Sequence, residues 1–372
     1  MTLFKKNFII SLILALIFFL NQPLQAITES DGPRVKTKKT GQKGIKKKKI
    51  TRISQKEKKP KRISQKKKKK RATSIKKREK TASTHRSSDS VSRKSPILEE
   101  PIRPYVSTAG SSLQNLVENE ILYLKELKHL LPGDQISLQV YDLNDKKMLA
   151  DINGNVIRNA ASLIKPFVML AVYDSIARQE LQETPEIEHQ ITRMIAVSDN
   201  GATNALIRRL GKGDVLQGII GINALMVKMG FSSTRLRELI PEGGKTYSNQ
   251  TSTADATLFF HLLYEQKLIN PQYSQKMNDI LLKNIHDRIK THRITQDGVA
   301  VADKTGYVRG LNGDCGIVYQ KSLNGRNDYA LSIIIENKNR PSDGGWGRKK
   351  SNAIRYLSDR IYENLKNGHS KS

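Results

Sequence analysis

The stretch Ser162-Leu163-Ile164-Lys165, followed by the apolar run Pro166-Phe-Val-Met-Leu-Ala-Val-Tyr173, is the most informative part of the sequence. The run predicts a buried helix that begins near Ser162. Residues i and i+3 share one face of a helix, so the Lys165 amine can reach the Ser162 hydroxyl. A buried or crowded lysine has a lowered pKa and can act as a base, which would activate Ser162 as a nucleophile. The pattern recurs at residues 64–67 and 74–77, but there it lies in low-complexity sequence.

Two tripeptides add polar side chains to this pattern. Ser198-Asp199-Asn200 lies between two predicted helices, where Ser and Asn are also ordinary helix caps. Lys304-Thr305-Gly306 ends the apolar strand predicted over residues 299–302 and is also compatible with a plain turn. Each motif alone is weak, and Lys39-Thr40-Gly41 shows how easily one recurs. Their order across helix, turn and strand is far more specific.

In this order the motifs resemble those of the serine β-lactamase and penicillin-binding-protein clan, most closely the class A β-lactamases. The resemblance covers roughly residues 111–365, including Asn200-Gly-Ala-Thr-Asn-Ala-Leu206 and Met229-Gly-Phe-Ser-Ser-Thr-Arg-Leu236. It implies a serine β-lactamase-like α+β fold, with an antiparallel sheet flanked by helices and an all-α subdomain.

The resemblance implies a role in the reaction for several residues. Ser162 would be the acylated nucleophile, Lys165 the base for acylation, and Ser198 the group that passes a proton to the leaving nitrogen. The backbone N–H groups of Ser162 and Tyr307 would form the oxyanion hole, where charge develops in the transition state.

Other residues would bind the substrate by the same resemblance. Asn200 would hold the substrate amide, and Lys304 and Thr305 would bind the substrate carboxylate. Gly306 would leave space for the substrate beside the strand.

Two positions depart from the class A pattern. Class A enzymes have a Glu after the Thr-Arg-Leu stretch that activates the deacylating water, and Ile240 falls at that place here. Glu238 and Glu242 lie two residues to either side, and each is either a replacement or a surface charge. Cys315 stands where many class A enzymes have a carboxylate-binding Arg, and Arg309 is a nearby substitute. Cys315 itself is expected to be a half-buried strand residue.

The first 26 residues have the parts of a secretory signal peptide. Lys5 and Lys6 precede an apolar run over residues 8–20, and Ala26 is a small residue at the end. The run is shorter than the ~20 residues that span a bilayer as a helix, although an uncleaved anchor is the alternative. We therefore expect export to a periplasm or to the outside of the cell.

Residues 27–104 are expected to form a disordered, lysine-rich tail and linker. The chain has a net charge of +30, and residues 34–94 contain 28 basic and 3 acidic residues. A segment so charged, and without Phe, Tyr or Trp over residues 31–104, cannot bury enough surface to offset its ordering entropy. Its expected partners are anionic envelope polymers or phospholipid surfaces, and a spacer without a partner is the alternative. Export and the missing aromatic residues disfavour nucleic acid.

Residues 105–372 have a globular composition and are expected to form the catalytic domain, as a monomer. Helices are predicted over residues 111–130, 187–197, 202–210, 215–229, 254–268 and 351–365. Strands are predicted over residues 135–142, 147–152, 299–304, 316–320 and 329–336. Strands at both ends of a helical middle indicate an α+β domain. No metal or cofactor is expected, since the seven His and single Cys form no metal-binding motif.

Three functions remain open at this point. The first is a β-lactamase that hydrolyses β-lactam antibiotics through an acyl-enzyme on Ser162 and so provides resistance. The second is a D-alanyl-D-alanine peptidase or an esterase-like penicillin-binding serine hydrolase that acts on cell-wall material. The third is an inactive envelope-binding protein.

Overall fold

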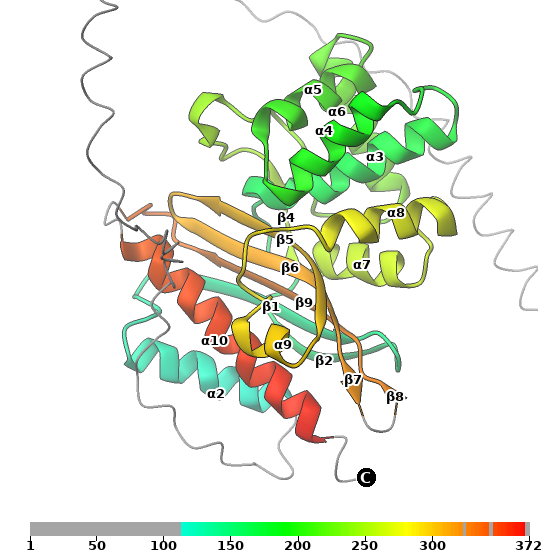
Figure 1. Cartoon of the computed structure of the whole chain (residues 1–372). Helices are drawn as coiled ribbons and strands as arrows, with labels where there is room; N and C mark the ends of the chain where they lie inside the picture. Colours follow the sequence, from blue (N-terminus) through cyan, green and yellow to red (C-terminus); the bar gives the residue numbers. More distant parts are fainter. Residues whose placement is uncertain (1–112, 323–324, 342–344, 369–372) are drawn as a thin grey trace, which may run out of the picture. The chain divides into compact units, whose positions relative to one another are not determined.

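The centre of the structure is a five-stranded antiparallel sheet with the strand order β2-β1-β9-β6-β5 (Figure 1). The computed structural model describes residues 113–322, 325–341 and 345–368. The predicted signal peptide and tail, residues 1–104, lie outside the described residues. The sheet strands are β1 (Gln135–Asp142), β2 (Lys147–Ile152), β5 (Ala300–Val308), β6 (Leu311–Tyr319) and β9 (Tyr329–Glu336).

Two short strand pairs lie outside the main sheet. They are β3 (Arg158–Asn159) with β4 (Gln250–Thr251), and β7 (Lys321–Ser322) with β8 (Gly325–Arg326).

Helices cover the sheet on both faces. Their bounds are α2 (Leu113–Glu126), η1 (Ala161–Ile164), α3 (Lys165–Ala177), α4 (Pro185–Ala196), α5 (Asn200–Leu210), α6 (Val215–Lys228), η2 (Glu242–Gly244), α7 (Thr253–Tyr264), α8 (Pro271–Leu281), α9 (His292–Gln296) and α10 (Gly345–Gly368). Figure 1 shows α2 and α10 side by side at one end of the molecule and α3 to α6 gathered at the other.

Strand β9 shows how the sheet separates two cores. Successive side chains of a strand point to opposite faces. Leu331, Ile333 and Ile335 belong to the core that contains α2 and α10. Ala330 and Ile334 belong to the core that contains α3 to α8. The antiparallel sheet flanked by helices, and the all-α part that extends from it, confirm the predicted α+β class.

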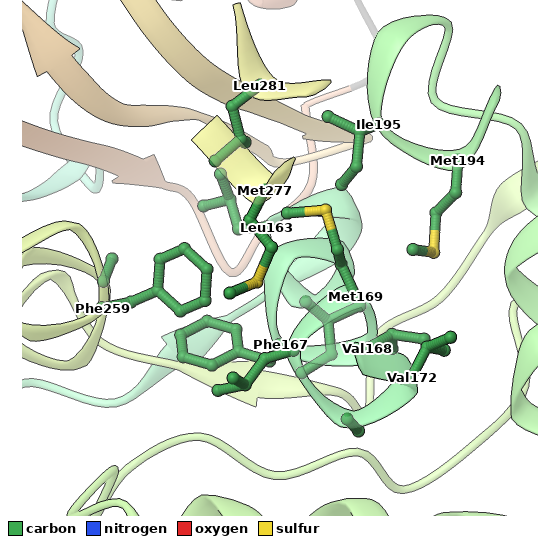
Figure 2. Close-up of a cluster of buried hydrophobic side chains, with 14 of the residues drawn as sticks. Leu163, Phe167, Val168, Met169, Val172, Met194, Ile195, Phe259, Met277 and Leu281 are labelled. Atoms are coloured by element: carbon green, nitrogen blue, oxygen red, sulfur yellow. The ribbon is translucent and has the colours of Figure 1, made fainter. Parts of the chain in front are cut away.

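Helix α3 lies inside the second core and is apolar on all its faces, as expected of a buried helix. The Phe167 ring packs against Phe231 at 5.1 Å and against Phe259 at 5.3 Å between centroids. Figure 2 shows Phe167 and Phe259 together with Met169 and Met277 in this cluster. The packing of Phe167 therefore fixes the position of the first turn of α3.

Most of the predicted helices and strands are present, and several begin or end at other residues than predicted. The strands predicted over residues 135–142, 147–152 and 329–336 are confirmed to the residue. The last helix begins at Gly345 rather than at residue 351, because Trp346 is buried and donates a hydrogen bond to Asp134 Oδ1 at 3.0 Å. Helices α8 and α9 were not predicted.

The prediction that Lys304-Thr305-Gly306 ends a strand is wrong. The tripeptide lies inside β5, which continues to Val308 and pairs along its whole length with β6. Glycine suggested a turn, but here it permits close packing: a Cβ at Gly306 would lie 2.7 Å from Leu163 Cγ in η1.

None of the helices in the described part of the chain is long and apolar enough to cross a membrane.

Candidate active site

The predicted nucleophile lies on a tight turn before the most buried helix. Ser162 is in η1, and α3 begins three residues later at Lys165. The turn is fixed by two hydrogen bonds of 2.7 Å, from the Ala160 N–H to Asn249 O and from the Ala161 N–H to Asn159 Oδ1. Ala161 has a φ of 43°, a left-handed conformation that costs a residue with a side chain about 1–2 kcal/mol. The fold thus holds Ser162 in a strained turn at the edge of a cleft.

The cleft has a volume of about 280 Å³ and lies between the β5 edge of the sheet and the all-α part. Ser162, Ser198, Asn200, Thr305 and Tyr307 all line it, so the three sequence motifs meet in one place.

Lys165 is fully buried behind the serines and has three oxygen partners. Its Nζ lies 2.6 Å from Ser198 O, 3.0 Å from Ser198 Oγ and 2.8 Å from Asn200 Oδ1. Burial, together with the positive charge of Lys304, lowers the pKa of Lys165 to about 6, although Asp199 acts in the opposite direction. The amine is therefore mainly neutral near pH 7 and is available as a base.

Ser198 bridges the lysine and the nucleophile. Its Oγ is 3.0 Å from Lys165 Nζ and 3.0 Å from Ser162 Oγ. Among the hydrogen bonds of the described residues, none joins the Ser162 and Lys165 side chains directly. A neutral amine has two donors and one lone pair, and only a hydroxyl among its three partners can donate to that lone pair. The geometry therefore supports proton movement from Ser162 through Ser198 to Lys165.

The turn that carries Ser198 is fixed at both ends. Ser198 has a φ of 58°, and Asp199 caps α5 by accepting from the Ala202 N–H at 2.8 Å. Asp199 also accepts from Arg193 Nε at 2.9 Å. Asp199, rather than Ser198 or Asn200, is thus the helix cap in this motif.

Lys304 is the second buried cation near the cleft, and it differs from Lys165 in protonation. Burial lowers the pKa of Lys304 to about 8, while the charges of Asp303 and Asp314 act to raise it. Its Nζ donates to Thr305 O at 2.8 Å. Lys304 is thus mainly charged near pH 7, so one lysine is positioned as a base and the other as a cation.

Arg288 is a third cation at the cleft, and none of the sequence motifs pointed to it. It lies in the loop between α8 and α9 and lines the cleft with His286 and Thr305. Arg288 Nε donates to Ser351 Oγ at 3.3 Å, while the buried Nη1 has no hydrogen-bond partner among the described residues. Burial lowers the pKa of Arg288, and Asp314 partly balances its charge. Because Arg288 and Thr305 line the same cleft, an unpartnered guanidinium nitrogen there is suited to an anionic ligand.

Two carboxyl groups near these cations, those of Asp303 and Asp314, are fully buried. Asp303 Oδ2 accepts from Asn284 Nδ2 at 2.6 Å, and Asp314 Oδ2 accepts from the Ile289 N–H at 2.9 Å. Burial raises the pKa of both, that of Asp303 well above its usual range, with a further contribution from the neighbouring Asp314 charge. The bond to Ile289 also fixes the loop that carries Arg288.

Tyr307 lies on the edge strand of the sheet. Among the described strands, β5 pairs only with β6, and the turn Arg309-Gly310 joins the paired residues Val308 and Leu311. Counted back from that pair, Tyr307 occupies a position whose N–H points away from β6. This orientation is compatible with the predicted oxyanion hole.

Of the two Glu candidates for deacylation, only Glu238 has a described side chain. Glu238 Oε1 accepts from Thr246 Oγ1 at 2.8 Å and from the Tyr247 N–H at 3.1 Å. Burial alone would raise the pKa of Glu238, but these hydrogen bonds and those from Ser248 lower it. Glu238 therefore braces its own loop and does not line the cleft. The side chain of Glu242 lies outside the described part of the structure.

Ile240 occupies the cleft wall instead. It is 3% exposed and lines the cleft. Asn204 holds its backbone on both sides, since Oδ1 accepts from the Ile240 N–H at 2.9 Å and Nδ2 donates to Ile240 O at 2.8 Å. An apolar side chain thus stands at the position where the resemblance implies a water-activating carboxylate.

Neither Cys315 nor Arg309 lines the cleft. Cys315 is buried among apolar side chains rather than half-buried, and burial raises the pKa of its thiol. Arg309 Nε donates to Arg340 O at 2.8 Å and to Pro341 O at 3.3 Å, beyond the cleft. Across the described ranges, no group of three or more His, Cys, Asp or Glu residues could hold a metal ion.

Comparisons with known proteins agree with this architecture. The sequence model of the β-lactamase enzyme family matches residues 123–190 and 182–365. No curated protein matches the chain.

Solved structures share the fold at low sequence identity. A β-lactamase from Sphaerobacter thermophilus DSM 20745 is 19% identical, with a TM-score of 0.57 over 68% of this chain and 98% of that one. PBP-A is 22% identical, with a TM-score of 0.56 over 68% and 96%. A mutant of PBP-A, solved as an acyl-enzyme complex with penicillin G, is 21% identical, with a TM-score of 0.54 over 66% and 96%.

Proposed function

Because the chain belongs to the β-lactamase enzyme family, we propose that it is a serine hydrolase that is acylated on Ser162 by β-lactams and by related cell-wall substrates. The observation that carries the proposal is the chain of 3.0 Å contacts from Ser162 through Ser198 to Lys165, whose pKa is lowered to about 6. This chain provides both a nucleophile and a base of suitable strength near neutral pH.

In the acylation step, Ser162 Oγ attacks the substrate carbonyl carbon and its proton passes to Ser198. Ser198 gives its own proton to Lys165, so no hydroxyl is left ionised. When the C–N bond breaks, the proton returns through Ser198 to the leaving nitrogen. The N–H groups of Ser162 and Tyr307 would stabilise the oxyanion.

The substrate would be oriented by its carboxylate and its amide. Thr305 and Arg288 line the cleft, and the buried Lys304 adds a positive charge next to Thr305. We assign carboxylate binding to these three residues, with Arg288 in the role expected of Arg309. Asn200 Oδ1 is occupied by Lys165, which leaves its Nδ2 to donate to the substrate amide.

The cleft favours slow release of the acyl group from β-lactams. Hydrolysis of the acyl-enzyme needs a base beside the ester bond on Ser162. The cleft wall where this base is expected is lined by Ile240, and the Glu238 carboxylate accepts hydrogen bonds within its own loop. The preferred function is therefore a penicillin-binding serine hydrolase acting on D-alanyl-D-alanine or ester-like substrates of the cell wall. A β-lactamase is the second candidate, because Glu242 directly precedes the cleft residues Gly243 and Gly244.

A time course of intact mass after addition of a penicillin tests the proposal. An adduct that persists for hours supports the penicillin-binding hydrolase. A transient adduct with release of hydrolysed drug supports the β-lactamase, and Glu242→Gln should then make the adduct persist. Absence of any adduct in the native protein would leave only an inactive envelope-binding protein.

We also propose that the protein is exported and that residues 34–94 bind anionic envelope polymers or phospholipid. The net charge of these residues supports this proposal.

A further inference from the structure

A second hollow, of about 290 Å³, lies beyond the Tyr307 end of the cleft. Arg309 lies at the end of β5, Lys338 and Arg340 follow β9, and Tyr247 follows the cleft residue Thr246; all four line the hollow. The cleft and the hollow are therefore adjacent, because Thr246 and Tyr307 line the cleft while Tyr247 and Arg309 line the hollow.

The hollow is strongly cationic. Arg309, Lys338 and Arg340 have no ion-pair partner in the part of the chain that the structure describes. Glu336 also lines the hollow, but its Oε2 lies 3.5 Å from Nη1 of the buried Arg158, which offsets its charge. Cations that gather without counter-charges repel each other, and an anionic ligand would relieve this repulsion.

The two arginines are held in place rather than extended into solvent. The Arg340 guanidinium stacks on the Tyr247 ring, 3.6 Å from its centroid. Arg309 Nε donates to Arg340 O at 2.8 Å, which ties the two residues together. Within the described part of the chain, the hydrogen bonds of Arg309 use only Nε, so its terminal nitrogens can bind a carboxylate.

By the proposed function, the acyl part of a bound substrate would extend toward the hollow. Arg309 directly follows β5, in the turn Arg309-Gly310, so it lies two residues and at most about 7 Å beyond Tyr307. In the proposed function the substrate carboxylate is at Thr305 and its carbonyl is beside Ser162 and Tyr307. The remaining acyl part therefore extends past Tyr307 toward Arg309.

We propose that the hollow is a second anion subsite, in which Arg309 and Arg340 bind a carboxylate at the far end of the substrate's acyl part. The proposal rests on the proposed function, because it assumes acylation of Ser162. It names the substrate class as an acyl donor with a carboxylate at each end.

Two penicillins with the same acyl side chain, one ending in a carboxylate and the other in its primary amide, test the subsite. The second-order rate constants of acylation are measured by intact mass. The native protein should prefer the carboxylate by about five- to tenfold. The double variant Arg309→Gln, Arg340→Gln should reduce this ratio to about one. The matched control Lys228→Gln, at an exposed position on α6, should keep it.

A salt titration of the native protein gives an independent readout that does not depend on folding of the variants. The preference should shrink as NaCl rises from about 50 mM to about 500 mM, because salt screens exposed charges. Equal rates for both penicillins, or a preference that survives the double variant, would overturn the subsite and leave the proposed function intact. Failure of both penicillins to acylate the native protein would overturn the proposed function as well.

Discussion

The side chain of Lys165 determines how acylation should depend on pH. Acylation requires a neutral Lys165 and a charged Lys304, whose pKa values are lowered to about 6 and about 8. The rate should rise as pH passes about 6, because Lys165 loses its proton, and fall above about 8, because Lys304 loses its own. Acylation rates measured by intact mass between pH 5 and pH 9.5 would show this bell.

Lys165→Gln is the variant that assigns the rising limb. It should lower the acylation rate by about 10²- to 10⁴-fold and remove the limb near pH 6. An unchanged limb in this variant would mean that another group is the base.

The position of Ile240 leads to a prediction about the rate at which the acyl group is released. Ile240→Glu places a carboxylate on the cleft wall at a backbone position that Asn204 already fixes. If the wild-type adduct persists because this wall lacks a base, the variant should release its acyl group at least about tenfold faster. Ile240→Gln is the control, since it is polar but cannot act as a base. Equal release from both variants would contradict this explanation.

The packing of β5 against η1 is the main contact between elements at the site. A Cβ at Gly306 would lie 2.7 Å from Leu163 Cγ and 3.2 Å from Leu163 N. Gly306→Ala should therefore destabilise the fold by about 1–3 kcal/mol and slow acylation by moving the turn that carries Ser162. Thermal unfolding and acylation rates measure the two effects.

Gly221→Ala in α6 is the matched control for Gly306. A Cβ there meets nothing within 4 Å, and Ala suits a helix interior better than Gly. It should be neutral or slightly stabilising, with unchanged acylation. If both substitutions had the same effect, close packing at Gly306 would not be the cause.

Some helices and strands could be predicted from the sequence, and others could not. The helix after Ser162 and the strands at residues 135–142 and 329–336 follow from local apolar patterns, so they were predictable. The length of β5 was not, because Gly306 suits a turn until the neighbouring η1 is known. Arg288 was missed because its place depends on a distant bond, from the Ile289 N–H to Asp314 in β6.

At the scale of the whole molecule, the charge is concentrated outside the domain that holds the site. Residues 34–94, with 28 basic and 3 acidic residues, carry a net charge of +25 out of +30 for the chain. Retention of the protein on anionic envelope material should fall steeply between low and physiological salt and disappear when residues 34–94 are deleted. The deletion should leave acylation by penicillin unchanged. Salt-independent retention would argue against binding by counterion release.

Acylation of Ser162 is the claim on which the other proposals depend, and the mass of its tryptic peptide tests it directly. Trypsin should release residues 159–178, since Pro166 protects the bond after Lys165. After incubation with penicillin G, this peptide should gain the mass of one penicillin on Ser162, and the Ser162→Ala protein should gain none. An unmodified peptide in the native protein, or an adduct that survives Ser162→Ala, would contradict the account.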